Sequence, residues 1–251
     1  CFFGIPQTIR AMQALVRYGA ARRRGIAALP APAGKEANIA DGALESALDA
    51  IGITAPKQEL TAAAPGEAAA AAARIGFPVA LKIVSAKISH KTEAGGVRLH
   101  LNNAEAVAAE AADLLSSLPD GAVDGFLVQE MVEGFEMLVG MRDDPDFGPL
   151  AVVGLGGVFV ELMHDVTLRL APVSQDDARE MLSELRGAQA LDGFRGQAPR
   201  DVDALAAAIA GLSSFFVDHR PWLTDIEINP LIVLERGKGV RAVDIRPVRR
   251  G

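Results

Sequence analysis

A lysine inside a strand-like apolar run constrains this chain more than any other feature. Residues 77–84 (FPVALKIV) are rich in Val, Ile and Leu and predict a buried strand that contains Lys82. A buried ammonium is costly unless an anion compensates its charge. Residues 89–97 (SHKTEAGGV) follow closely and offer cationic side chains and unobstructed backbone N–H groups. The strand lysine and the cationic segment that follows it together favour a nucleotide polyphosphate as ligand. A lysine that reaches solvent, followed by a surface hairpin, would give the same pattern.

A second feature, near the end of the chain, suits a metal ion. Residues 224–233 (TDIEINPLIV) and 240–245 (VRAVDI) alternate apolar and polar side chains around a glycine-containing turn, which predicts an antiparallel hairpin. Glu227 and Asn229 are two positions apart and therefore project from one face, and Asp244 can lie opposite them. Two carboxylates and an amide oxygen suit Mg²⁺. An Asn-Pro pair after a strand is also ordinary turn chemistry, so the prediction depends on the combination with Lys82.

These segments, in this order along the chain, resemble the ATP-grasp domain of the NDP-forming acyl-CoA synthetases. That family includes the beta subunit of ADP-forming acetate–CoA ligase and, more distantly, the beta subunit of succinyl-CoA synthetase. The resemblance extends from about residue 40 to 248 and departs mildly at Ala94, where the family usually has valine, and at His164, where a basic residue is more usual. It is carried by residues 78–85 (PVALKIVS), 89–97, 129–132 (QEMV), 154–161 (GLGGVFVE) and 227–231 (EINPL).

The resemblance implies how ATP or ADP and Mg²⁺ are bound. The strand that contains Glu130 would meet the adenine edge, and Glu136 would hold a ribose hydroxyl, although the alternative for both residues is a solvated strand carboxylate. Glycines without a Cβ would let the backbone approach the phosphates. The implied nucleotide ligands are Lys82, Lys91, Gly95, Gly96, Glu130, Met131, Val132, Glu136, Gly156 and Gly157, and the implied metal ligands are Asn229, Asp244 and Glu227.

The resemblance also implies the catalytic residues. His90 matches a histidine that takes a phosphoryl group from a phosphohistidine on the CoA-ligase part and delivers it to ADP, a task that suits the nucleophilic imidazole ring. Lys91 would offset the charge that develops on the transferred group. Arg169 would do the same, or would merely pair with Asp165.

Composition excludes several classes of protein. The 251 residues have a net charge of −7 and no Lys/Arg cluster beside aromatic residues, which argues against a nucleic-acid partner. One cysteine, Cys1, excludes an internal disulfide framework and fits a reducing compartment. Arg74, Lys82 and Glu161 interrupt the apolar runs, so no membrane span is expected. No signal-peptide pattern is present, and a cytoplasmic soluble protein is predicted.

Helix-like and strand-like segments alternate and predict an α/β (α+β) fold, which the resemblance makes an ATP-grasp fold with nucleotide between two lobes. Residues 1–37 hold a helical pattern and a Pro/Gly/Ala stretch, which we interpret as the tail of a preceding CoA-ligase-type domain or, alternatively, as a helix of the same domain. The ATP-grasp domain then spans 38–251, divided into lobes 38–122 and 123–251. Expected helices are 41–51, 65–75, 104–118, 175–185 and 202–217; expected strands are 57–60, 77–84, 97–101 and 150–153, with 126–132 and 136–141 paired around Glu133-Gly134.

The predicted function is the nucleotide-binding module of an ADP-forming acyl-CoA synthetase, in which acyl-CoA, ADP and phosphate give acid, CoA and ATP. The implied partner is a CoA-binding domain or subunit, in a hetero- or homo-oligomer. Two alternatives remain at this point. One is an ATP-dependent carboxylate ligase that works through an acyl phosphate. The other is a nucleotide-sensing domain fused to an acetyltransferase, which would tolerate loss of His90.

Overall fold

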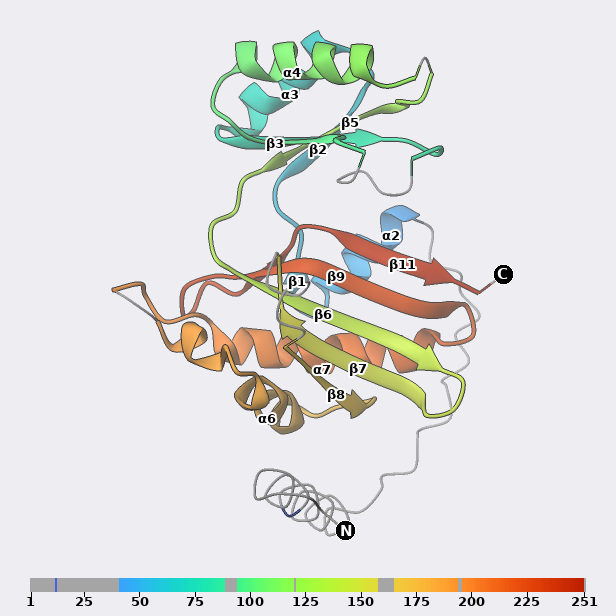
Figure 1. Ribbon diagram of the computed structural model, residues 1–251, viewed down its shortest axis with the longest axis vertical. Helices are drawn as coiled ribbons and strands as arrows, with labels where there is room; N and C mark the ends of the chain where they lie inside the picture. The colour runs from blue at the N-terminus through green and yellow to red at the C-terminus, as the bar shows by residue number, and fades with distance from the viewer. Residues whose placement is uncertain are drawn as a thin grey trace, which may run out of the picture.

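The computed structural model describes residues 12, 41–88, 94–119, 121–157, 165–193 and 196–250. Most of them form two lobes, each built on a β-sheet, and the two sheets face one another with helices on their outer sides (Figure 1). Met12 stands alone in the first forty residues, so the predicted tail helix and linker lie outside the described part of the chain. The two-lobed mixed fold expected from the sequence is confirmed.

The smaller lobe is a four-stranded antiparallel sheet of order β2-β5-β3-β4 under two helices. Strand β3 alternates: Val79, Leu81 and Ile83 are buried toward the helices, and Lys82 therefore points toward the other lobe. The side chain of Asn103 accepts a hydrogen bond from Ala106 N at 2.8 Å and caps α4. The elements are β2 (Gln58–Ala62), α3 (Pro65–Ile75), β3 (Val79–Val84), β4 (Val97–Leu101), α4 (Ala104–Ser117) and β5 (Gly125–Glu130).

The larger lobe is a seven-stranded sheet of order β1-β10-β9-β6-β7-β8, with β11 also paired to β9. Its core lies between the sheet and helices α6 and α7. Ser174 and Asp177 form a capping box at the start of α6. The elements are α2 (Asp41–Asp49), β1 (Ile53–Thr54), β6 (Phe135–Asp144), β7 (Gly148–Leu155), β8 (Val166–Leu170), α6 (Gln175–Glu184), the 3₁₀ helix η1 (Ala188–Asp192), α7 (Val202–His219), β9 (Leu223–Val233), β10 (Val240–Ala242) and β11 (Ile245–Arg249).

Two sequence-based assignments need correction. Strands β5 and β6 are not paired with each other: β5 lies between β2 and β3, and β6 lies between β7 and β9. The sequence does not distinguish these two arrangements, because a short polar connection suits both a hairpin and a crossing between sheets. The division of the lobes at 122/123 differs too, since β5 belongs to the smaller sheet while α2 and β1 belong with the larger one.

Helix α7 also corrects the expectation that no apolar run reaches membrane-spanning length. By length and composition it qualifies, with 18 residues and a mean hydropathy of 1.3. However, 56% of this segment is buried inside the protein, and side chains such as Leu205, Ile209 and Phe216 belong to the core of the larger lobe. The helix is apolar because it is a core helix.

Candidate functional site

Lys82 joins the two lobes. It lies on β3 of the smaller lobe, and its Nζ donates to Gln129 Oε1 at 2.8 Å and to the carbonyl oxygen of Val243 at 3.1 Å. Val243 belongs to the larger lobe, between β10 and β11. The strand lysine that the sequence singled out is thus directed into the space between the sheets, where a ligand could contact both.

The three predicted metal ligands come together beside this contact. The backbone N–H of Asn229 donates to the carbonyl oxygen of Asp244 at 3.1 Å, and its side-chain Nδ2 donates to Glu227 Oε1 at 3.4 Å. Asp244 is also the neighbour in sequence of Val243, the acceptor for Lys82. The predicted return strand is interrupted at this point, since β10 ends at Ala242 and β11 begins at Ile245.

The donor set of this cluster fits Mg²⁺. Across the described residues, no group of three or more His, Cys, Asp or Glu side chains gathers into a metal centre. The cluster instead offers two carboxylates and one amide oxygen, and Mg²⁺ commonly takes few protein ligands and completes its shell with water and phosphate. The carboxylate of Asp244 also accepts from Arg246 Nε at 3.1 Å, so a metal ion would compete with this guanidinium.

The predicted adenine-binding strand ends at one of the two crossings between the lobes. The backbone N–H of Glu130 donates to Lys57 O at 2.8 Å, and Glu130 Oε2 accepts from Lys57 N at 3.2 Å. The Met131 N–H donates to Pro78 O at 3.1 Å. Residues 130–132, including Val132, therefore lie where the chain leaves the smaller sheet, at the edge of the space that Lys82 enters.

Glu136 and the glycine loop after β7 are packed tightly together. Gly156 N donates to Glu136 O at 2.8 Å, and a Cβ on Gly156 would lie 2.7 Å from the Glu136 carbonyl carbon. Gly157 has a φ of +62°, and a Cβ there would lie 2.0 Å from Glu136 Oε2. Gly156 requires glycine because backbone atoms of Glu136 and Met137 occupy the space, and Gly157 favours glycine because of its positive φ.

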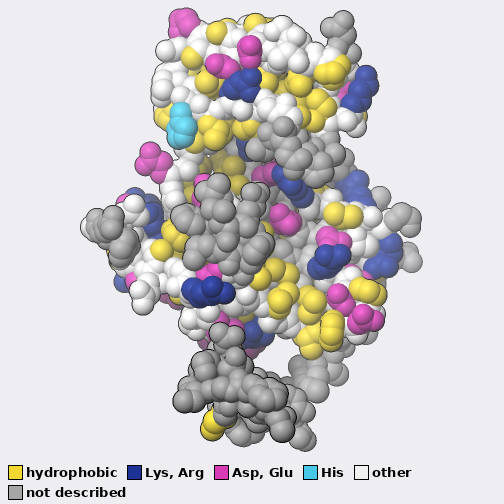
Figure 2. All heavy atoms as spheres, viewed as in Figure 1, with side chains coloured by type: hydrophobic (Ala, Val, Ile, Leu, Met, Phe, Trp, Pro, Cys, Tyr) yellow, Lys and Arg dark blue, Asp and Glu magenta, His cyan; other side chains and the backbone are white. Residues whose placement is uncertain are grey.

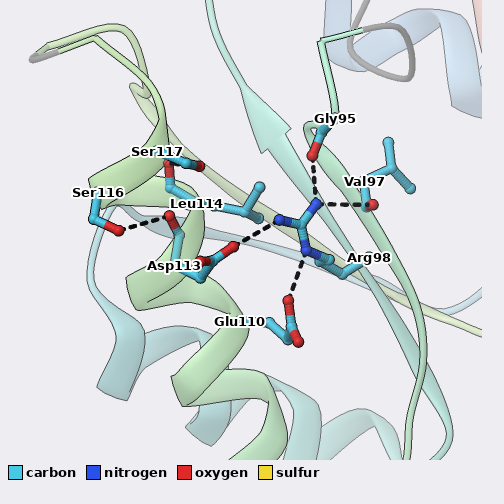
Figure 3. A network of polar contacts seen from close by, with 8 residues as sticks. All are labelled: Gly95, Val97, Arg98, Glu110, Asp113, Leu114, Ser116 and Ser117. Atoms are coloured by element: carbon cyan, nitrogen blue, oxygen red, sulfur yellow. Dashed lines mark hydrogen bonds and ion pairs between the residues drawn. The ribbon is translucent and has the colours of Figure 1, made fainter.

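The turn Gly95–Gly96 is held from two sides. Gly96 O accepts from Ile83 N at 2.9 Å, which ties the turn to β3 beside Lys82. Gly95 O accepts from the guanidinium of Arg98, which also bonds Glu110 at 2.6 Å and Asp113 at 2.8 Å on α4 (Figure 3). These contacts, first with Asp113 and then with Glu110, raise the pKa of Arg98 above its ordinary value.

His90 and Lys91 lie outside the described residues. The turn that follows them is nevertheless placed, since Gly95 and Gly96 are described. It lies against β3, the strand that carries Lys82.

Arg169 is not brought together with the other predicted site residues. On β8, Arg169 lies in register with Ala151 of the neighbouring strand β7, and Ala151 is buried on the helix-facing side of the larger sheet. The Nη2 of Arg169 bonds Glu184 Oε1 of α6 at 2.8 Å on that side. Glu227 lies on the opposite side of the sheet, where it pairs with Gly140. Asp165 does not pair with Arg169 in these contacts and accepts instead from the backbone N–H groups of Arg186 and Gly187.

Gln129 lies beside Lys82 in the candidate site, and sequence reasoning missed it. It lay within a matched segment but received no role, although it is 2% exposed and accepts from Lys82. The available signal was a polar side chain directly after the apolar residues 126–128 (FLV) of the strand. On the face of the molecule seen in Figure 2, the described Lys and Arg side chains are interspersed with Asp and Glu.

Comparison with known proteins extends these findings. A family model described as "ATP-grasp domain" matches residues 32–248. The beta subunit of acetate–CoA ligase [ADP-forming] II of Pyrococcus furiosus is 34% identical over 209 residues, which cover 81% of this chain and 88% of that subunit. The 4-hydroxybutyrate–CoA ligase [ADP-forming] of Nitrosopumilus maritimus is 36% identical over 221 residues, which cover 84% of this chain.

The chain spans only part of some of these relatives, since it covers 31% of the Nitrosopumilus ligase and 27% of acetate–CoA ligase [ADP-forming] I of Archaeoglobus fulgidus. Among solved structures, acetyl-coenzyme A synthetase 1 of Candidatus Korarchaeum cryptofilum superposes with a TM-score of 0.73 at 36% identity, over 81% of this chain and 89% of that one. Another structure of that enzyme holds coenzyme A and Mg-AMPPCP, with its phosphohistidine segment pointing towards the nucleotide-binding site. The relatives named above are ADP-forming acid–CoA ligases or their subunits. Because the family model matches most of its length, this chain belongs to the ATP-grasp family.

Proposed function

We propose that this chain is the nucleotide-binding module of an ADP-forming acyl-CoA synthetase. The overall reaction converts acyl-CoA, ADP and phosphate into acid, CoA and ATP, reversibly, and needs a CoA-binding domain or subunit as partner. The observation that carries the proposal is the contact of Lys82 with Val243 O across the lobes, one residue from Asp244. This contact supports the proposal, because a cation that could bind phosphate and a carboxylate that could bind a metal ion lie beside one space, as a nucleotide polyphosphate requires. The cytoplasm is the proposed location.

Nucleotide would lie between the sheets. The strand end at Glu130, Met131 and Val132 would receive the adenine, and Glu136 the ribose. Lys82 and the backbone of the glycine turns would bind phosphate oxygens. Asn229 and Asp244, with Glu227 beside them, would hold Mg²⁺, whose charge offsets that of the β- and γ-phosphate oxygens.

The proposed chemical role belongs to His90. A ring nitrogen of His90 attacks the phosphorus of the partner's phosphohistidine, so that one N–P bond forms while the other breaks. An oxygen of the ADP β-phosphate then attacks this phosphorus, the N–P bond at His90 breaks, and ATP leaves. Lys91 would stabilise the transferring group by its charge. The relative whose phosphohistidine segment points towards its nucleotide site supports this direction of transfer.

Calorimetry tests the binding half of the proposal. The wild-type chain is expected to bind Mg·ADP, and Lys82→Ala should weaken binding by about 1.5–3 kcal/mol, the usual contribution of a hydrogen bond to a charged group. Lys238→Ala is the matched control, since Lys238 is exposed and pairs with Glu235 in the turn after β9. No binding of Mg·ADP by the folded wild-type chain would contradict the assignment.

Phosphoryl labelling tests the relay. Incubation with the phosphorylated CoA-ligase partner should label the wild-type chain at an acid-labile, base-stable position, and His90→Asn should abolish the label while nucleotide affinity stays unchanged. His100→Asn is the control, because His100 is exposed and its φ of +59° is one that asparagine tolerates. Retained ATP synthesis by the His90→Asn variant would remove the relay and favour direct transfer.

A further inference from the structure

A continuous chain of side-chain hydrogen bonds begins at Lys82 and ends on a helix of the other lobe. Lys82 Nζ donates to Gln129 Oε1 at 2.8 Å, and Gln129 Nε2 donates to Gln58 Oε1 at 2.7 Å. Gln58 Nε2 then donates to the two carboxylate oxygens of Glu45 at 3.0 and 3.1 Å. The four residues come from β3, β5, β2 and α2.

The direction of each bond in this chain is fixed by chemistry. An ammonium has only donors, so Gln129 must offer Lys82 its oxygen, and its NH₂ group is left for Gln58. An ionised carboxylate has only acceptors, so Gln58 must offer Glu45 its NH₂ group. The orientation of both amides thus follows from the two charged ends, and neither amide can flip without opposing two donors or two acceptors.

Gln129 orients the ammonium group of Lys82. The amide oxygen of Gln129 and the carbonyl oxygen of Val243 are neutral acceptors, which orient the ammonium. Gln129 is itself fixed, because it is 2% exposed and its Nε2 lies 2.7 Å from Gln58 Oε1 and 3.4 Å from Val243 O. A long side chain with many rotamers is thereby confined before a ligand arrives, which lowers the entropy that binding must cost.

The far end of the chain is anchored in the larger lobe. Glu45 lies on α2, and its neighbours Leu44 and Leu48 belong to the core of that lobe. The brace from Glu45 through Gln58 therefore fixes Gln129 relative to the larger sheet, on which the metal-ligand cluster lies.

We infer that Gln129 is a positioning residue for nucleotide phosphate: it sets Lys82 Nζ toward the space beside Asp244, and Gln58 and Glu45 brace it from the other lobe. This inference rests on the proposed function and adds a residue to it. Gln129 touches no reacting atom in this arrangement. It acts through Lys82, and its contribution should disappear when Lys82 can no longer hold phosphate.

A double-mutant cycle read by calorimetry tests the inference. Gln129→Met keeps the length of the side chain and removes both hydrogen-bonding groups. It should raise the Kd for Mg·ADP about tenfold, or about 1.4 kcal/mol. In a Lys82→Met background the same change should alter the Kd by less than about twofold, because the two residues act as one unit. Adenosine, which has no phosphate, should bind wild type and Gln129→Met equally.

Two further variants complete the test. Gln58→Met leaves Gln129 in place and removes only the brace, so it should raise the Kd for Mg·ADP about threefold, as loss of a neutral hydrogen bond does. Gln175→Met, at the exposed start of α6, is the matched control and should leave the Kd unchanged.

The possible outcomes separate the inference from the proposed function. Wild type that binds no Mg·ADP overturns both. Wild type that binds Mg·ADP, together with unchanged affinity in Gln129→Met, overturns the positioning role alone. Equal losses for ADP and adenosine in Gln129→Met also overturn it, because they indicate a general disturbance of the fold. A loss confined to ADP, and absent without Lys82, establishes it.

Discussion

At the residue scale, the candidate site depends on a few close contacts rather than on a densely charged cavity. The Glu136 carboxylate fills the space where Gly157 has no Cβ, and Arg246 shares the Asp244 carboxylate. Each contact fixes a side chain that would bind nucleotide or metal. Single substitutions at these positions therefore have separable effects on stability and on binding.

Gly157→Ala should weaken nucleotide binding as well as the fold. A non-glycine residue at its φ of +62° costs about 1–2 kcal/mol, and the new Cβ would also displace the Glu136 carboxylate. Gly237→Ala is the control, because Gly237 has a φ of +82° with no atom within 4 Å of its Cβ position. Urea unfolding should show similar decreases in the free energy of unfolding for the two variants, because both residues are strained at a positive φ. The Kd for ADP should rise only in Gly157→Ala. Equal ADP affinity in the two variants would exclude Glu136 from ribose binding.

Asp244→Asn should reduce the dependence of ADP binding on Mg²⁺, because an amide oxygen is a weaker ligand for a hard cation than a carboxylate. Titration of Mg²⁺ at a fixed ADP concentration should show that Asp244→Asn lowers the affinity for Mg²⁺ by about tenfold or more. Loss of a charged hydrogen-bonding partner has an effect of this size. Asp225→Asn on the same hairpin provides the comparison, since Asp225 pairs with Arg142 and is not one of the three predicted metal ligands. If both variants match the wild type, the metal ion lies elsewhere.

At the element scale, strand β4 and helix α4 are joined by one guanidinium. Arg98 bonds two carboxylates one helical turn apart on α4 and also the carbonyl oxygen of Gly95 (Figure 3). Its side chain is 27% exposed, so its contacts are partly shielded from water. The turn Gly95–Gly96 is therefore tied to a helix as well as to β3.

Arg98→Met should lower the free energy of unfolding by about 1–3 kcal/mol, because it leaves two carboxylates and a carbonyl without their donor. Arg74→Met is the comparison: Arg74 also forms hydrogen bonds with a carboxylate, that of Glu59, but its side chain is 59% exposed, and such pairs contribute about 0–1 kcal/mol. Urea denaturation measures both losses. Equal losses would show that the partial burial of Arg98 adds nothing.

The elements differ in how well the sequence predicts them. Helices α3, α4 and α6 were predicted within one residue, because proline at N1, Asn103 and Ser174 mark their starts. Local patterns of this kind also located Lys82. They carry no information on which strand pairs with which, and the predicted pairing of β5 with β6 was wrong for that reason.

The residues of the candidate site differ in the same way: local patterns predict some of them, and others depend on contacts that are distant in the sequence. Lys82, Asn229 and Asp244 were predicted from residue type and spacing, and the structure brings them near one another, while their roles stay predictions. Arg169 was placed by its position after the glycine loop, yet the alternation of β8 turns it to the helix side. Gln129 acquires its importance from Val243 and Gln58, which are 114 and 71 residues away along the chain.

At the scale of the whole molecule, the candidate site belongs to neither lobe alone. Lys82 comes from the smaller sheet, and Asn229 and Asp244 come from the hairpin of the larger one. A nucleotide bound to both would connect them. Binding energy would then appear as resistance of the whole chain to unfolding.

Mg·ADP at about 100 times its Kd should stabilise the folded chain by about 2.7 kcal/mol, as mass action requires for a ligand that binds only the native state. Urea unfolding with and without nucleotide measures this gain. Removal of Mg²⁺ by a chelator should cancel most of it, and Lys82→Ala should reduce it at the same ADP concentration. A gain that persists in chelator would argue against a metal-bridged nucleotide.

The two crossings between the lobes lie side by side, because Lys57 and Glu130 exchange hydrogen bonds where the chain enters and leaves the smaller sheet. Residues 57–130 therefore form an insertion whose two ends meet. A protease that cuts one crossing should not release this lobe, since the other crossing and the larger sheet still hold it. A gene that joins the residues flanking 57–130 directly should yield a shortened chain that keeps the core of the larger lobe. The segment 57–130, expressed separately with its two ends joined, should tolerate new termini at any of its exposed turns.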